Sequence, residues 1–394
     1  MTHGIPKGFR LAVAEAGFKY SGRNDAALVV SELPACAAGL FTSNLFQAAP
    51  VMLGKARLKR GGPVRAVLFN AGQANACTGE EGLEDCRQSL QLVAAACGLE
   101  AGDILPASTG VIGMRMPMSA WENAAPLLAD SLGRASLEDF AKAMMTTDAF
   151  PKYVCETLLL SGGEVTLAGA AKGAGMICPN MATMLSLVLC DAVMEPGLWQ
   201  SMFVRATARS FNRVTVDGDT STNDTLYGLA NGASGVEVKG KDLAMLEEVL
   251  TRLLGQLAYM LVKDGEGATK VLHIHVTGAR DAGDAEMAAR AVGHSPLVKT
   301  AAYGMDANWG RIVAALGRSG ARFAPDEVRI CLCGVELFRG GIPTELDFDA
   351  LLKNDLRKRD MRLDISLGAG PGAYRLLASD LGHKYVTINA DYRS

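Results

Sequence analysis

Two hydrophobic periodicities alternate along this chain, and the alternation limits the folds open to it. Short apolar runs of the kind found in β-strands recur throughout, whereas other stretches repeat apolar residues at three- to four-residue steps, as helices do. The strand-like runs cover residues 64–69, 154–160, 184–190, 271–277, 328–333, 362–367 and 385–389. Mixed strands and helices of this kind predict an α/β fold, in the sense of an α+β sandwich.

Three segments carry helical signals. Ser136 followed by Asp139 resembles a capping box, which predicts a helix from there. Ser119 with Glu122 forms a similar opening for a helix through residue 128, although Pro126 weakens its middle. Leucines recur at helical spacing over residues 244–262 and predict a long amphipathic helix.

Charge balance and cysteine usage narrow the class of protein. The 39 lysines and arginines nearly match the 42 acidic residues, and no basic stripe interleaved with aromatic residues is present, so we expect no nucleic-acid partner. The most apolar stretch, residues 176–194, is interrupted by Pro179, Asn180 and Asp191, so we expect no membrane span. Nine scattered cysteines, and a beginning without the apolar core of a signal peptide, indicate reduced thiols in the cytoplasm.

Candidate metal ligands are few. His273 and His275 share one face of a predicted strand, but no third ligand is suggested nearby, and two packed histidines are the favoured interpretation. Cys331 and Cys333 have the same spacing, and they too lack further ligands for a metal site. We therefore predict no metal and no resident cofactor.

Two polar loops also carry possible chemistry. Residues 217–224 read DGDTSTND, but Thr222 stands where a calcium loop needs glycine and Gly228 where it needs glutamate. A polar turn that hydrogen-bonds to itself and packs against something polar is the better interpretation. Residues 265–270 lack the spacing of a nucleotide loop, although Glu266 could hold an amino group.

The segment from Lys172 to Leu185 is the most informative one. Its glycines and Pro179 mark unusual backbone just before an apolar strand, so that Thr183 lies at the junction of loop and strand. The turn at residues 108–113 offers backbone N–H groups and a hydroxyl that could bind an oxyanion. From the residues alone, a catalytic Thr183 and a simple turn entering a buried strand both remain open.

Taken together and in order, these motifs resemble the ornithine acetyltransferase family of the arginine pathway, the bifunctional glutamate N-acetyltransferases and amino-acid acetyltransferases. The similarity covers nearly the whole chain and rests on residues 70–79, 108–110, 146–148, 172–185, 217–224, 265–270, 308–311 and 389–394. The resemblance implies the ornithine acetyltransferase or DmpA-like fold of a self-processing enzyme that is similar to the Ntn hydrolases.

The resemblance also implies a cut between Ala182 and Thr183. It would give an α chain of residues 1–182 and a β chain of residues 183–394, assembled as an α2β2 heterotetramer. The expectation is chemically consistent, because an N-terminal threonine carries its own base in the free α-amine. The reference pKa of such an amine, about 8, lies close enough to neutrality to accept a proton.

Site residues are implied in the same way. Thr183 would be the nucleophile, and Thr109 and Gly110 would form the oxyanion hole. The substrate-binding positions of the family match Thr146, Thr147, Lys172, Thr183, Glu266, Asn389 and Ser394, and the choice between the two adjacent threonines stays open. A lysine suits an α-carboxylate and a glutamate suits an amino group.

The implied reaction moves an acetyl group from N2-acetyl-L-ornithine to L-glutamate through an acetyl-enzyme. Some members of the family also use acetyl-CoA as a donor and others do not, and the sequence leaves both open. A related self-processing threonine amidase or aminopeptidase would pass the acyl group to water instead. A third interpretation is an unprocessed binding homologue, which the retention of Thr183 after Ala182 disfavours.

Overall fold

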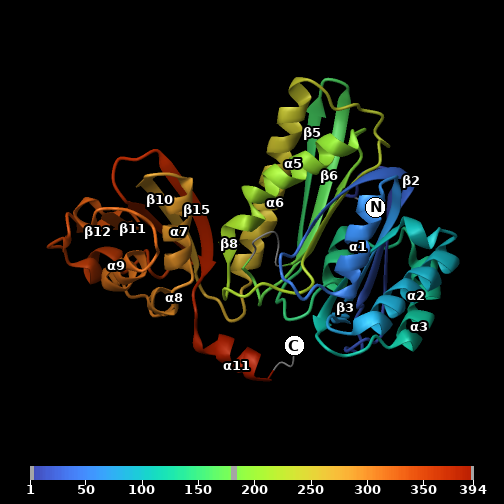
Figure 1. Ribbon diagram of the computed structural model, residues 1–394, viewed down its shortest axis with the longest axis horizontal. Helices are drawn as coiled ribbons and strands as arrows, with labels where there is room; N and C mark the ends of the chain where they lie inside the picture. The colour runs from blue at the N-terminus through green and yellow to red at the C-terminus, as the bar shows by residue number, and fades with distance from the viewer. Residues whose placement is uncertain (1–3, 179–183, 392–394) are drawn as a thin grey trace. The chain divides into compact units, whose positions relative to one another are not determined.

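The computed structural model describes residues 4–178 and 184–391 and divides into two compact units (Figure 1). The first unit contains the described residues up to Asn212 and those from Asp219 to Leu261. The second contains residues 213–218 and the chain from Val262 onward. Each unit is built on its own β-sheet with helices packed against it, which confirms the predicted mixed α/β fold.

Among the described residues, the sheet of the first unit has the strand order β4-β3-β2-β9-β7-β6-β5, with β1 paired to β2. The β3–β4 and β7–β9 pairs are parallel and the others are antiparallel. The strands are β1 (Phe9–Ala14), β2 (Ala26–Phe41), β3 (Val64–Gln73), β4 (Ile104–Val111), β5 (Lys152–Leu160), β6 (Gly163–Lys172), β7 (Leu185–Cys190) and β9 (Thr225–Ala230). The helices are α1 (Ala49–Arg60), α2 (Gly79–Cys97), α3 (Met118–Ser131), α4 (Leu137–Ala143), α5 (Pro196–Ala208) and α6 (Lys241–Lys263), with short 3₁₀ turns at Ala101–Asp103 and Phe211–Arg213.

Period-two alternation gives this sheet two apolar faces. Leu28 and Leu68 point to one face, which α2 and α3 cover with Trp121 among others. Val29 and Phe69, one residue further along the same strands, point to the other face. There Phe140 of α4 joins them, and a strand with both faces buried needs both faces apolar.

The second unit has the strand order β13-β12-β11-β14-β10-β15-β8 in the part of the chain that is described. Its strands are β8 (Val214–Thr215), β10 (Val271–Ala279), β11 (Arg329–Leu332), β12 (Val335–Arg339), β13 (Ile342–Pro343), β14 (Asp360–Ser366) and β15 (Gly372–Ser379). Its helices are α7 (Ala282–Gly293), α8 (Pro296–Tyr303), α9 (Trp309–Gly317), α10 (Phe348–Leu352) and α11 (His383–Asp391), with a 3₁₀ turn at Pro325–Glu327. Ile274, Val292 and Ile312 lie in its apolar core, which therefore joins β10 to α7 and α9.

Two local predictions are wrong. Residues 385–389 were expected to form a strand, but they belong to α11, a helix without a buried residue. Their β-branched side chains suit a strand, yet without a neighbouring strand only a helix satisfies their backbone groups internally. Ser119 does not cap α3 either, because that helix begins one residue earlier, at Met118, with Pro117 as its N-cap.

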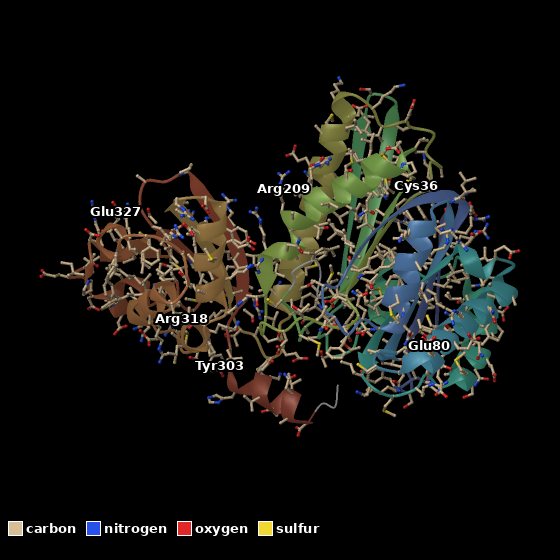
Figure 2. The ribbon with its side chains drawn as sticks, viewed as in Figure 1. Cys36, Glu80, Arg209, Tyr303, Arg318 and Glu327 are labelled. Carbon is tan, nitrogen blue, oxygen red and sulfur yellow. The ribbon has the colours of Figure 1, made fainter. Side chains whose placement is uncertain are left out.

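The helix beginning after Ser136 is confirmed in detail. The Ser136 hydroxyl accepts a hydrogen bond from the Asp139 amide at 3.1 Å, and the Asp139 carboxylate accepts one from the Ser136 amide at 3.0 Å. The long helix predicted over 244–262 is α6. All nine cysteines are free thiols, including Cys36 on β2 (Figure 2).

Candidate active site

The predicted oxyanion pair lies at the carboxyl end of β4. That strand runs parallel to β3, with Thr109 opposite Ala71 and Gly110 opposite Gly72. Gly110 has a φ of +133°, which only glycine adopts readily, and a Cβ there would overlap the carbonyl of Gly72. The strand therefore requires glycine at this position, and it leaves Thr109 and Gly110 only half-buried while their neighbours are buried. The turn predicted over residues 108–113 is thus wrong in its first four residues, because β4 continues to Val111 through its pairing with β3. We call residues 108–111, the end of β4, the oxyanion turn.

Lys172, the last residue of β6, reaches this turn. Its Nζ lies 3.3 Å from Oγ1 of Thr109 and donates a hydrogen bond to it. Lys172 is also the cross-strand partner of Leu185, the first residue of β7. With only 8% of its surface exposed, it is no solvated surface charge. The structure thus brings Lys172 and Thr109 together, 63 residues apart in sequence.

A buried ion pair supports the same region. Asp148 accepts a hydrogen bond from Nζ of Lys152 at 2.7 Å and another from the amide of Gly173 at 2.6 Å. Burial alone would raise the pKa of the Asp148 carboxyl, but the charges of Lys152 and Lys172 outweigh it and hold that pKa well below its ordinary value. Asp148 therefore ties the residue after Lys172 to the start of β5.

Thr146 and Thr147 precede this aspartate and are both half-buried. The backbone N–H of Thr146 donates to Oδ2 of Asp148 at 3.0 Å, which fixes the main chain at that point. Which of the two side chains contacts substrate stays a prediction.

In the second unit, Glu266 and Asn389 meet each other. Nδ2 of Asn389 donates to Oε2 of Glu266 at 2.7 Å and to the carbonyl of Tyr385, one helical turn back, at 3.0 Å. Glu266 is 8% exposed, so it does not lie on a solvated turn. The loop that carries it is anchored by Thr269, whose amide and hydroxyl both donate to Asp380 at 2.8 and 2.5 Å.

Three predicted residues lie outside the described ranges. They are Ala182 and Thr183, which flank the predicted cut, and Ser394. The first described residue after these is Met184, whose carbonyl accepts a hydrogen bond from the amide of Thr225 at 2.9 Å. The boundaries 1–182 and 183–394 therefore stay predictions.

Sequence reasoning missed the roles of Asp148, Lys152 and Asn223. Asp148 follows a predicted substrate threonine, and no sequence signal indicated that its carboxylate would form a buried ion pair with Lys152. Asn223 stood in a loop expected to pack against polar groups, but its partners lie far away in sequence: its amide donates to the carbonyl of Ser108. Pairings of this kind are set by the tertiary fold, and a local pattern does not reveal them.

Each histidine considered as a metal ligand has an aspartate as neighbour. His273 lies 2.7 Å from Asp360 and His275 lies 3.5 Å from Asp364. No group of three or more potential metal ligands occurs within residues 4–178 and 184–391. Over those same ranges, the helices are all too short or too polar to cross a membrane.

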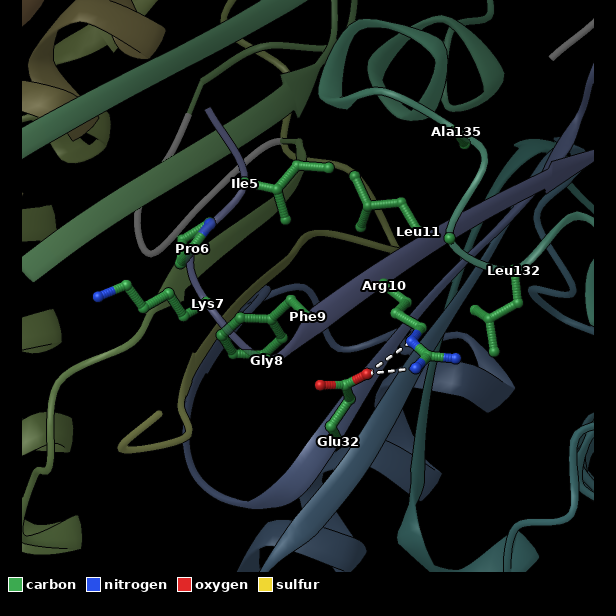
Figure 3. A pocket seen from close by; sticks show the side chains of 11 residues that line it. Ile5, Pro6, Lys7, Gly8, Phe9, Arg10, Leu11, Glu32, Leu132 and Ala135 are labelled. Atoms are coloured by element: carbon green, nitrogen blue, oxygen red, sulfur yellow. Dashed lines mark hydrogen bonds and ion pairs between the residues drawn. The ribbon is translucent and has the colours of Figure 1, made fainter. Parts of the chain in front are cut away.

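A separate cavity of about 550 Å³ opens beside β1 in the first unit (Figure 3). An ion pair between Arg10 and Glu32, 2.5 Å apart, lies in its wall. Its lining, which runs from Ile5 to Leu11 and includes Leu132 and Ala135, contains none of the predicted site residues.

Comparison with known proteins identifies the family. The ArgJ family model matches residues 10–394. The arginine biosynthesis bifunctional protein ArgJ of Nitratidesulfovibrio vulgaris is 62% identical over 99% of this chain and 99% of its own length. That of Geobacter sulfurreducens is 47% identical over 98% and 99%. The crystal structure of the Bacillus halodurans protein is 34% identical, with a TM-score of 0.49 over 51% of this chain and 96% of its own.

The family model and the two relatives from Nitratidesulfovibrio vulgaris and Geobacter sulfurreducens define an enzyme of arginine biosynthesis. The chain belongs to the ArgJ family, and the predicted resemblance to the ornithine acetyltransferases is confirmed.

Proposed function

We propose that this protein is a self-cleaving threonine acetyltransferase that moves the acetyl group of N2-acetyl-L-ornithine to L-glutamate. Family membership supports the class of reaction, and one geometric observation supports the site. That observation is the hydrogen bond between buried Lys172 and Thr109, which brings a cation to the turn predicted to bind the oxyanion.

The proposed reaction has two halves. The hydroxyl of Thr183 attacks the acetamide carbonyl of acetylornithine while its own α-amine takes the hydroxyl proton. The Thr109 hydroxyl and the Gly110 amide donate to the developing oxyanion, and losing one such donor typically costs about 3 kcal/mol. The C–N bond breaks, and ornithine leaves with the proton from the α-amine. The α-amine of glutamate then attacks the acetyl ester and restores Thr183, so no cofactor is needed.

Lys172 and Glu266 have the charges that an amino-acid substrate needs. From the family resemblance we propose that Lys172 binds its α-carboxylate and that Glu266 binds its amino group or the ornithine side chain. Asn389 and one of Thr146 and Thr147 are proposed as further substrate residues on the same ground. Ser394 is proposed as a further substrate residue, so a C-terminal extension should lower activity without unfolding the protein.

The sheet topology supports cleavage without dissociation. In the first unit, β9 and β7 from residues after 183 lie between β2 and β6 from residues before 182. After cleavage, the strands of the two fragments would therefore still be hydrogen-bonded to each other in one sheet. An α2β2 assembly is proposed from the family resemblance.

Denaturing electrophoresis with N-terminal sequencing tests the proposal. The purified protein should give two fragments, the second beginning Thr183-Met184-Leu185, and Thr183→Ala should stay in one piece and be inactive. A single full-length band from active wild-type protein would contradict the mechanism.

The acceptor and the donor are tested separately. Transfer from acetylornithine should require glutamate, whereas steady release of free acetate without glutamate would favour the related amidase or aminopeptidase. Replacing acetylornithine with acetyl-CoA, again with glutamate, tests whether the same threonine accepts a second donor.

A further inference from the structure

The polar loop that ends at Asp224 becomes steadily more buried toward its end. Thr222 is 8% exposed, Asn223 4% and Asp224 2%, although all three are polar. The proposed reaction assigns none of them a role. Buried polar side chains need hydrogen-bond partners, and the partners here include Ser108, which precedes Thr109, and Met184, which follows Thr183 in the sequence.

Asn223 is bonded to the oxyanion turn. Its Nδ2 donates to the carbonyl of Ser108 at 2.8 Å, one residue before Thr109, and to the carbonyl of Ala74 at 2.6 Å, just after β3. Its Oδ1 accepts a hydrogen bond from the Thr222 hydroxyl at 2.7 Å. One side-chain amide thus joins the carboxyl ends of β3 and β4.

Asp224 and the residue after it hold the backbone of Met184. The amide of Met184 hydrogen-bonds to the Asp224 carboxyl, and the carbonyl of Met184 accepts from the amide of Thr225 at 2.9 Å. Met184 follows Thr183 directly in the sequence. Asn223 and Asp224 are consecutive, so a single planar peptide unit joins the two residues that make these attachments.

Burial raises the pKa of the Asp224 carboxyl well above its ordinary value. Hydrogen bonds from Ser221 and Met184 and the charge of Lys172 lower it only in part. Oδ2 of Asp224 has no hydrogen-bond partner among the described residues. A protonated carboxyl and an asparagine side chain have nearly the same shape and both offer a donor and an acceptor, so asparagine is a matched replacement.

We propose that Asn223 and Asp224 are positioning residues that hold the oxyanion turn and the backbone next to the nucleophile in register with each other. They act through Ser108 and Met184. The inference rests on the proposed function, because it assigns Thr109, Gly110 and residue 183 their chemistry. Both self-cleavage and acetyl transfer should depend on this register, since a displacement of about 1 Å can cost on the order of 10²-fold in rate.

The test compares Asn223→Ala with Asn231→Ala. Asn231 is a matched control, because it is also buried and also donates from Nδ2 to a backbone carbonyl, that of Lys7, at 3.0 Å. Both variants should lose a similar amount of thermal stability. Asn223→Ala should cleave more slowly and, once cleaved, lose roughly 10- to 100-fold in kcat with KM within about twofold of wild type. Asn231→Ala should keep both rates.

Asp224 supplies a second pair should Asn223→Ala fail to fold. Asp224→Asn should cleave and transfer at rates close to wild type, and Asp224→Ala should be slow in both. Wild-type rates in folded Asn223→Ala or in Asp224→Ala, or an equal loss of kcat in Asn231→Ala, would overturn the inference. If wild type itself were uncut and inactive, the proposed function would fail and this inference with it. Cut, active wild type with unaffected variants would remove only the inference.

Discussion

Two regions of the first unit each bury an aspartate, and they shift the pKa of its carboxyl in opposite directions. Asp148 has an ammonium group at 2.7 Å and a pKa below its ordinary value, whereas Asp224 has hydroxyl and amide partners and a pKa well above it. The charge of Lys172 lowers both pKa values. The difference therefore comes from Lys152, the direct cation partner that only Asp148 has, and burial by itself does not decide whether a carboxyl is ionised.

The largest expected effect comes from replacing each aspartate with asparagine, which removes a negative charge only at Asp148. Asp148→Asn should lose about 3–5 kcal/mol of unfolding free energy, because it leaves the buried Lys152 without its counter-charge. Asp224→Asn should change that free energy by less than about 1 kcal/mol, because it replaces a neutral acid with a neutral amide. Urea unfolding at pH 7 measures both, and equal losses would contradict the assignment of opposite protonation states.

Lys172→Met gives the next largest effect and tests the cation that the two regions share. Charged hydrogen bonds to a substrate carboxylate contribute about 1.5–3 kcal/mol, so KM for acetylornithine should rise roughly 10- to 100-fold. The pKa of both aspartates should rise, and Asp148 should stay ionised because Lys152 remains. Steady-state kinetics of the cleaved variant measures KM. Lys55→Met, at a lysine on α1, is a control that should leave KM unchanged.

The sequence predicted the helices and strands better than it predicted the contacts within the candidate site. The cap at Ser136 and the helix α6 follow from local spacing, and Thr109 and Lys172 were predicted through the family resemblance. The strand expected at residues 385–389 was wrong because β-branched residues indicate a strand only where a neighbouring strand exists. The bond from Asn223 to Ser108 spans 115 residues, so no local pattern contains it. Lys152 follows Asp148 by only four residues, but the local sequence does not show that both side chains are fully buried.

The two aspartates should contribute slopes of opposite sign to the dependence of folding stability on pH. The lowered pKa of Asp148 gives stability that is present above the ordinary aspartate pKa of about 3.9 and is lost as the pH falls below it. The raised pKa of Asp224 does the reverse: above about pH 3.9 the unfolded chain releases a proton that the folded protein keeps, so stability declines as pH rises. Each slope is at most about 1.4 kcal/mol per pH unit.

Urea midpoints from pH 3 to 8 test this for wild type, Asp148→Asn and Asp224→Asn. The first variant should lose the acid-sensitive part of the wild-type profile, and the second should lose the decline above pH 4. A steeper decline in Asp224→Asn than in wild type would show that the carboxyl is ionised in the folded protein.

The smallest expected effect concerns a third aspartate, Asp139. It has hydrogen-bond partners like those of Asp224 but differs from it in burial. Asp139 has the same kinds of partner as Asp224, a serine hydroxyl and a backbone amide, both from Ser136. Those hydrogen bonds lower the pKa of Asp139, because it lies near the surface and burial opposes them only weakly. Ser136→Ala should therefore raise the pKa of Asp139 toward its ordinary value and cost about 1 kcal/mol through loss of the cap. It should leave acetyl transfer unchanged. An NMR titration of Asp139 measures the first effect, and an unchanged pKa would mean that hydrogen bonding does not set the ionisation of these carboxyls, which would remove the contrast with Asp224.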